Sequence, residues 1–154
     1  AEVMRAVRPH TKLPVIVKMA PHDVGETARA LEAEGADALS LINTIPGMAI
    51  DVRTRRSRLS RATAGISGPI VHHMAVRMVW EAYHAVRIPL CGIGGVTTGE
   101  DAAEFILAGA TAVSVGTANL CDPRCAPRIL SELRQWASEQ GANDIRELIG
   151  AVEC

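Results

Sequence analysis

The sequence predicts an α/β chain in which parallel strands alternate with helices. Short apolar runs of the kind that form buried strands recur along the chain. Amphipathic stretches with helical spacing lie between these runs, and strands alternating with helices are typical of a parallel sheet. We count four such βα units in 154 residues, which is the length of one ordinary domain.

The first unit begins with a strand over residues 13–19. This run is continuous and rich in β-branched residues, as expected of a strand buried on both faces. A helix is expected over about residues 24–34, because apolar residues recur there at helical spacing. Gly35 should end that helix. The second strand is expected at residues 38–43.

A long connection, residues 44–68, follows the second strand. It is rich in Arg, Ser, Thr and Gly. Loops of this length inside a compact domain are usually functional or disordered. A cluster of arginines is most often a solvated loop, but the length of this connection suggests a lid or a partner surface. The arginines are Arg53, Arg55, Arg56, Arg58 and Arg61.

The third unit pairs a helix over about residues 69–86, which has Pro in its first turn, with a strand at 88–93. This strand ends in Gly94-Gly95. Thr98 or Thr97 should cap the next helix, which should end near Gly109.

The fourth strand is expected at residues 112–117, followed by a helix at about 127–139 and a short one at about 143–149. Four βα units could form a small open sheet or half of an eight-fold barrel.

Composition excludes several functions. The net charge of -1 and the 3% aromatic content argue against nucleic-acid binding. No apolar run approaches the roughly 20 residues that span a bilayer, and no signal-peptide core is present. We therefore expect a cytoplasmic protein without membrane contact. The chain does not begin with Met, which suggests a processed chain or a piece of a longer one.

The cysteines are expected to be reduced thiols. Their spacing is poor for a zinc site, and a chain without an export signal seldom carries disulfides. They are Cys91, Cys121, Cys125 and Cys154.

Polar and glycine residues at the strand ends are the candidate site, because ligands of parallel sheets bind at the carboxyl ends of the strands. Gly94-Gly95 and Gly116-Thr117 end the last two strands, where backbone N–H groups could hold a phosphate. The alternative is a purely structural role, in which these glycines only make tight turns.

Lys18 and Asn43-Thr44 end the first two strands. A lysine in an apolar strand requires an anionic partner unless it reaches solvent, and Asn-Thr is also a common turn or cap. Four histidines show no carboxylate or metal-ligand pattern in the sequence, so we expect them at the surface or in packing: His22, His72, His73 and His84.

Several of these segments resemble the dihydroorotate dehydrogenases. Residues 17–21, Val-Lys-Met-Ala-Pro, resemble the family's V-K-L-[ST]-P strand, and residues 42–44 resemble its I-N-T. Residues 47–55 resemble the G-M-A-I-D-x-x-T-[RK] loop of the NAD-linked class 1B. Residues 67–69, 77–79, 92–96 and 115–119 continue the match in order over nearly the whole chain.

The resemblance implies an FMN-dependent (β/α)8 barrel. Lys18 would then contact the flavin and favour its anionic reduced ring, and Asn43 and Thr44 would hydrogen-bond the pyrimidine substrate. The remaining FMN-binding residues would be Ile42, Gly68, Gly94, Gly95, Gly116 and Thr117, the last four around the phosphate.

The match implies that residues 1–154 are the C-terminal half of such a barrel, strands five to eight. The family's loop with a cysteine base has no counterpart here, so we expect no catalytic residue in this chain and no turnover by it alone. His72-His73 stand where the family has Lys-Pro.

For the whole enzyme, the resemblance implies oxidation of dihydroorotate to orotate in pyrimidine biosynthesis. A cysteine removes a proton and a hydride passes to the flavin. Electrons then pass through a partner subunit with FAD and a 2Fe-2S cluster to NAD⁺. No metal site is expected in this chain itself.

Other functions remain open. A dihydropyrimidine dehydrogenase-like enzyme or another FMN oxidoreductase would share most of these motifs. A non-catalytic half-barrel that binds phosphate and assembles with itself is a third possibility, because an open half-barrel exposes sheet edges and apolar surface. A homo-oligomer is expected in either case.

Overall fold

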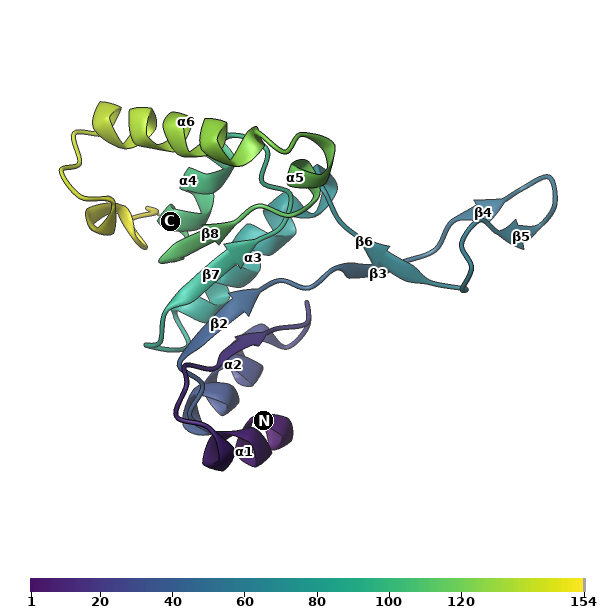
Figure 1. Ribbon diagram of the computed structural model, residues 1–154, viewed down its shortest axis with the longest axis horizontal. Helices are drawn as coiled ribbons and strands as arrows, with labels where there is room; N and C mark the ends of the chain where they lie inside the picture. Colours follow the sequence, from purple (N-terminus) through teal and green to yellow (C-terminus); the bar gives the residue numbers. More distant parts are fainter. Residues whose placement is uncertain (154) are drawn as a thin grey trace.

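Four parallel strands form the central sheet of the structure, a computed structural model that describes residues 1–153. In spatial order they are β1 (Ile16–Lys18), β2 (Ala38–Leu41), β7 (Leu90–Ile93) and β8 (Ala112–Ser114). All three pairings are parallel, and one row of paired residues runs across the whole sheet. Figure 1 shows the four strands side by side through the body of the molecule. The predicted α/β class with parallel βα units is therefore confirmed.

Helices cover one face of this sheet. α3 packs on β2 and β7, α4 packs on β8, and α6 packs on α4. The side chains that β2 and β7 turn toward them are buried, including Leu39, Leu41 and Leu90. The helices and 3-10 turns are α1 (Glu2–Val7), η1 (Arg8–His10), α2 (Val24–Ala33), η2 (Pro69–Val71), α3 (His72–Tyr83), α4 (Gly99–Leu107), α5 (Thr117–Cys121), α6 (Cys125–Glu139) and η3 (Ile145–Leu148).

The opposite face of the sheet is open. Lys18, Ser40 and Cys91 lie in register on this face, and none of them is buried. Ile16 on β1 is 61% exposed. Within residues 1–153, β1 and β8 each have only one strand neighbour, so both outer edges are unpaired. A curved parallel sheet with helices outside and an open inner face is the arrangement of part of a (β/α)8 barrel.

The connection between β2 and α3 is ordered as an antiparallel ribbon. β3 (Ile45–Gly47) pairs with β6 (Ala64–Ile66), and β4 (Ile50–Asp51) pairs with β5 (Arg56–Ser57) beyond them. The ribbon extends away from the sheet (Figure 1). Of the two alternatives for a loop of this length, disorder is therefore excluded.

A capping box starts α4. The Thr98 hydroxyl accepts the N–H of Asp101 at 3.1 Å, and the Asp101 carboxylate accepts the N–H of Thr98 at 2.9 Å. Of the two residues proposed as the cap, Thr98 is therefore the correct one. The Thr97 N–H and hydroxyl both donate to the same carboxylate.

Several element boundaries differ from the sequence prediction. The helix expected over 69–86 is the 3-10 turn η2 followed by α3, which ends at Tyr83. The strands are shorter than expected, and α6 begins at Cys125. The short helices α1 and α5 carry too few residues to show an apolar period, and the sequence did not indicate them.

Cys91, Cys121 and Cys125 are free thiols in the structure, as expected. The prediction for Cys154 lies outside the described residues. No helix within residues 1–153 is both long enough and apolar enough to cross a membrane.

Candidate functional site

A cavity of about 250 Å³ lies at the carboxyl ends of the four parallel strands. Every residue that the sequence predicted for the cofactor or the substrate lines it. These residues lie at the ends of the four strands or in the connections that follow them. The parallel sheet therefore brings them to one place. They are Lys18, Ile42, Asn43, Thr44, Gly68, Gly94, Gly95, Gly116 and Thr117.

Gly94 and Gly95 form a tight turn after β7 that only glycine fits. Their φ angles are 149° and 70°, in the region that favours glycine. A Cβ on Gly95 would lie 2.8 Å from the Gly68 carbonyl oxygen and 2.8 Å from the Cβ of His72. The two glycines are therefore needed for the packing of this turn, whether or not a ligand binds. The alternative that these glycines make tight turns is correct in part.

Gly116 has a different environment. Its φ is -106°, which other residues can adopt, and a Cβ there would meet only the Ile93 side chain, at 3.9 Å. Neither Gly95 nor Gly116 donates a backbone hydrogen bond to another backbone group of residues 1–153. Both N–H groups are therefore free to bind an anion.

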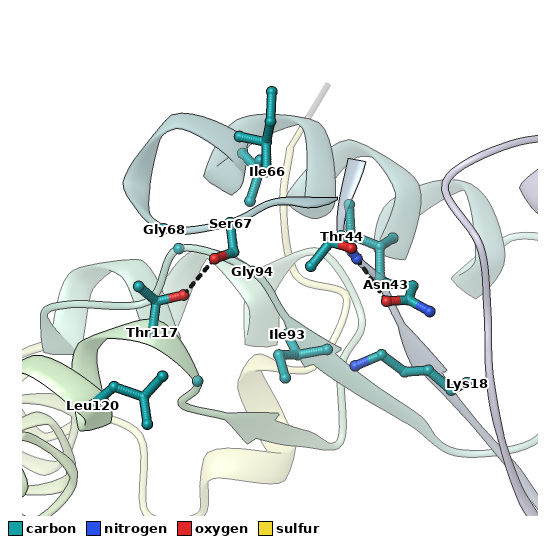
Figure 2. A pocket seen from close by; sticks show the side chains of 14 residues that line it. Lys18, Asn43, Thr44, Ile66, Ser67, Gly68, Ile93, Gly94, Thr117 and Leu120 are labelled. Carbon is teal, nitrogen blue, oxygen red and sulfur yellow. Dashed lines mark hydrogen bonds between the residues drawn. The ribbon is translucent and has the colours of Figure 1, made fainter. Parts of the chain in front are cut away.

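Ser67 and Thr117 join the two connections that border the cavity. The Thr117 hydroxyl donates to the Ser67 hydroxyl at 2.9 Å, as the dashed line in Figure 2 shows. Ser67 is a lining residue that was not predicted from the sequence, although it lies in the Ser-Gly-Pro motif. The other unselected lining residues are apolar and carry no chemical signal in a sequence: Ile66, Val71, Ile93 and Leu120.

Lys18 extends from the end of β1 toward the cavity (Figure 2). It is exposed, and none of the ion pairs formed within residues 1–153 includes it. Its ammonium therefore reaches solvent, as one alternative held, and it also remains available to an anionic ligand. The neighbouring Cys91 is a neutral thiol, because burial raises its pKa.

Asn43 and Thr44 lie beside Lys18 at the cavity rim (Figure 2). The Asn43 carboxamide oxygen accepts the N–H of Thr44 at 2.8 Å, so the turn interpretation holds for this atom. The amide group of Asn43 keeps its two donors. The Thr44 side chain packs on Gly65, where a Cβ would lie 2.1 Å from the Thr44 hydroxyl oxygen.

The histidines are at the surface or in packing as expected, with one correction. His72 is buried and has carboxylate neighbours, the nearest being Glu104 at 3.2 Å from its Nε2. The sequence gave no sign of this pair because its members lie 32 positions apart on two helices. His22, His73 and His84 are exposed.

The groups that line the cavity suit an anionic ligand. Glycine N–H groups and the Thr117 hydroxyl lie at one end, and the Lys18 ammonium and the Asn43 amide lie at the other. Its described lining contains no carboxylate, histidine or cysteine side chain. This set of groups binds and orients a ligand, and it stabilises negative charge.

The family model for dihydroorotate dehydrogenase matches residues 1–136. Two curated relatives are named dihydroorotate dehydrogenase B (NAD(+)), catalytic subunit. The protein from Desulforudis audaxviator is 53% identical over 99% of this chain and 50% of its own length. The protein from Geobacter sulfurreducens is 54% identical over 98% of this chain and 50% of its own length.

A solved structure is also similar, the crystal structure of the Eimeria tenella DHODH in complex with ferulenol. It superposes with a TM-score of 0.73 and 29% sequence identity, over 90% of this chain and 38% of that one. The chain thus spans about half the length of the curated relatives it matches.

Proposed function

The chain belongs to the dihydroorotate dehydrogenase family, and from this premise we propose that its cavity is an FMN seat in an enzyme that oxidises dihydroorotate to orotate. One observation carries the proposal. All nine residues that the family motifs predict for FMN and substrate line a single cavity at the strand ends. These residues span positions 18 to 117, and the parallel sheet brings them together at the strand ends.

The glycines fit a phosphate group. Gly95 and Gly116 have free N–H groups, and Gly116 has no side chain that would stand between its backbone and a ligand. The Thr117 hydroxyl donates its single hydrogen to Ser67 in this structure, and it would become a further donor by turning that hydrogen toward the ligand. At about 250 Å³ the cavity is smaller than the roughly 300–1,000 Å³ of most small-molecule sites. This size fits a seat whose remaining wall comes from the other strands of a complete barrel.

FMN, when bound, supplies a two-electron acceptor. Lys18 places a positive charge beside the ligand and stabilises negative charge there, an effect that is stronger when water is excluded. Asn43 presents its amide donors to a carbonyl or carboxylate of the pyrimidine. Residues 1–154 thus bind and orient both partners of the reaction, as a partial FMN-binding barrel domain.

Proton removal from the substrate requires a group that this cavity lacks. Cys91 has its thiol on the open face, but its raised pKa keeps it protonated and it does not line the cavity. A positioned base contributes about 10²–10⁴-fold to a rate. We therefore propose that the base is on the other half of the barrel, on the cysteine loop that the resemblance implies.

The names of the relatives also suggest a partner. Both are catalytic subunits of an NAD(+)-linked enzyme, so electrons would leave through a second subunit carrying FAD and an iron–sulfur cluster. The exposed arginines of the ribbon, none of which is ion-paired within residues 1–153, provide a charged surface for such a contact. The product would enter pyrimidine biosynthesis.

Titration of the purified full-length protein with FMN, followed by flavin fluorescence, tests the proposal. Saturable one-to-one binding and bleaching of the flavin absorbance by dihydroorotate are expected. Lys18→Met should slow the bleaching while retaining FMN. Lys12→Met is the matched control, because Lys12 is exposed, lies away from the cavity and is the chain's only other lysine. Failure to bind FMN would reject the proposal, and bleaching only by another pyrimidine would favour a related FMN oxidoreductase.

The open edges of β1 and β8 favour a second candidate, a self-assembling half-barrel without catalysis. Two copies could pair these edges and cover their open faces. Light scattering of the 154-residue chain distinguishes the two. A stable dimer that binds phosphate but not FMN would support this second candidate.

A further inference from the structure

Three potential metal ligands converge between α3 and α4, on the helix-covered side of the sheet. The Glu104 Oε2 atom lies 3.2 Å from Nε2 of His72 and 3.6 Å from Nδ1 of His73. All three atoms lie within 4.8 Å of one another. None of these residues lines the cavity at the strand ends.

His72 is held in one orientation by its other nitrogen. Nδ1 lies 2.9 Å from the Gly94 carbonyl oxygen, which can only accept, so Nδ1 must carry the hydrogen. In the neutral ring Nε2 then has a lone pair and no hydrogen. A histidine that binds a metal usually donates its second N–H to a carbonyl or carboxylate in this way.

The Nε2 atom of His72 is buried without a hydrogen-bond partner. The side chain is 5% exposed, and Nε2 forms no hydrogen bond within residues 1–153 even though Glu104 is 3.2 Å away. The oxygen therefore lies off the direction in which a proton on Nε2 would point. With Nε2 unprotonated, two electron-pair donors face one another at this distance, and a cation bound between them would relieve the repulsion.

We propose that His72 Nε2, His73 Nδ1 and Glu104 Oε2 bind a divalent transition-metal ion of the Zn²⁺ type. With bonds of about 2.0–2.1 Å, two ligands of a tetrahedral ion lie roughly 3.3–3.4 Å apart. The two separations from Glu104 Oε2, 3.2 and 3.6 Å, are close to this spacing, and the three ligand atoms all lie within 4.8 Å of one another. Two imidazoles and one carboxylate are a ligand set that Zn²⁺ accepts, with the fourth position open to water.

Among the described residues, the carboxylate of Glu104 has basic partners only in the two histidines. Within residues 1–153, no lysine or arginine forms an ion pair with Glu104. Arg77 lines a groove together with His73 and Glu104, but its guanidinium is paired with Glu81. Asp101 has one oxygen 3.8 Å from Nε2 of His72, while its other oxygen accepts the Thr97 and Thr98 hydrogens. The site therefore has spare negative charge for a cation.

The three ligands lie outside the lining of the proposed FMN seat and outside the family motifs, although His72 contacts the Gly94 turn. His72-His73 stand where the resemblance leads us to expect Lys-Pro. These two ligands are therefore a departure from the family pattern. Bound metal would keep His72 in the neutral tautomer that donates to Gly94, and it would tie the start of α3 to α4.

Titration of the tag-free full-length protein with Co²⁺ and Zn²⁺ tests the proposal. One Co²⁺ per chain should bind with visible absorption of a tetrahedral site, and Zn²⁺ should displace it. His73→Ala and Glu104→Gln should each weaken binding by about tenfold or more. Both positions are solvent-accessible (87% and 46% exposed), so the variants should fold, which FMN binding and thermal unfolding can verify.

His22→Ala is the matched control. His22 Nδ1 lies 3.6 Å from Asp23 Oδ2, the same separation as His73 and Glu104, but on an exposed turn without a third ligand. This variant should bind metal as the wild type does. The proposal is overturned if no stoichiometric metal binds, or if His22→Ala loses as much affinity as His73→Ala. It is also overturned if ¹⁵N NMR shows a proton on Nε2 of His72 in the presence of one equivalent of Zn²⁺.

Discussion

The hydroxyl of Thr117 donates a 2.9 Å hydrogen bond to the hydroxyl of Ser67, 50 residues earlier in the chain. Ser67 follows β6, the last strand of the ribbon, and Thr117 begins α5 after β8. The bond therefore connects the return of the ribbon to the last strand of the sheet. It also directs the Thr117 hydroxyl along the wall of the cavity, where a phosphate is proposed to bind.

Thr117→Val should weaken FMN binding by about tenfold or more. Hydrogen bonds to charged groups contribute roughly 1.5–3 kcal/mol, and 1.4 kcal/mol corresponds to a factor of ten in Kd. Ser67→Ala removes only the neutral partner and should cost less, about 0.5–1.5 kcal/mol. Flavin fluorescence titration of both single variants and the double variant measures the coupling.

Thr111→Val is the control for this pair. Its hydroxyl donates to the Leu90 carbonyl at the opposite end of β8, away from the cavity. It should lower thermal stability slightly and leave FMN affinity unchanged. Equal FMN affinity of Thr117→Val and Thr111→Val would contradict a role for Thr117 in binding.

Gly116→Ala should weaken FMN binding without destabilising the fold. The φ of Gly116 is -106°, outside the left-handed region, and the nearest atom to a new Cβ is 3.9 Å away. The added methyl group would stand where a phosphate approaches the backbone. Circular dichroism and thermal unfolding should match the wild type, while the fluorescence titration should show a loss of affinity.

Gly95→Ala provides the contrast. Its φ of 70° and contacts at 2.8 Å to backbone and side-chain atoms force strain on any Cβ. A non-glycine residue in such a conformation costs about 1–3 kcal/mol, so its melting temperature should fall. If the melting temperature of Gly116→Ala falls as far as that of Gly95→Ala, the fold requires both glycines. Gly116 would then not be a position that matters chiefly for the ligand.

The sequence predicted the sheet and the cavity well because both depend on local patterns. Apolar runs such as 38–41 locate the strands, and parallel strands bring their carboxyl ends together whatever the connections do. Lys18 and Gly116 could therefore be assigned to one site from their positions alone. The sequence narrowed the cap of α4 to Thr97 or Thr98 but could not choose between them, because each is followed three positions later by an acidic residue.

Contacts between residues distant in sequence could not be predicted. The ribbon forms because β3 meets β6 across 16 intervening residues, and no local pattern in the sequence indicates which distant segment a strand pairs with. Burial of His72 depends on α4 packing beside α3, and its contact with Glu104 depends on the relative rotation of the two helices. Neither the packing of these two helices nor their relative rotation can be deduced from the spacing of residues along the sequence.

Thr98→Ala should lower the free energy of unfolding by about 1 kcal/mol, the usual contribution of a threonine N-cap. Both bonds of the capping box involve this residue, but the bond from its backbone N–H survives the substitution. Thr98→Ser keeps the hydroxyl and should restore most of the stability. Urea unfolding of the three proteins checks the order, and an alanine variant as stable as the wild type would show that the cap is not needed.

Asp37 should make the folded state less stable in acid. Its carboxylate accepts the N–H of Val15 at 2.7 Å and a guanidinium hydrogen of Arg8 at 2.7 Å. The backbone hydrogen bond first, and then Arg8, hold the pKa of this carboxyl below its usual range. Because the folded pKa is lower than the unfolded value of about 3.9, the stabilisation is complete above pH 3.9. It is lost as pH falls through the folded pKa.

Thermal unfolding between pH 6 and pH 2.5 tests this assignment against Asp37→Asn. The asparagine keeps an acceptor oxygen for Val15 but cannot titrate, so the wild type should be the more stable protein at pH 6. The difference between the two should shrink steadily below about pH 4. Subtracting the variant's profile also removes the contribution of Asp144, whose pKa is lowered to about 2 by its hydrogen bonds with Arg146. A stability difference that stayed constant down to pH 2.5 would mean that the Asp37 charge does not stabilise the connection before β1.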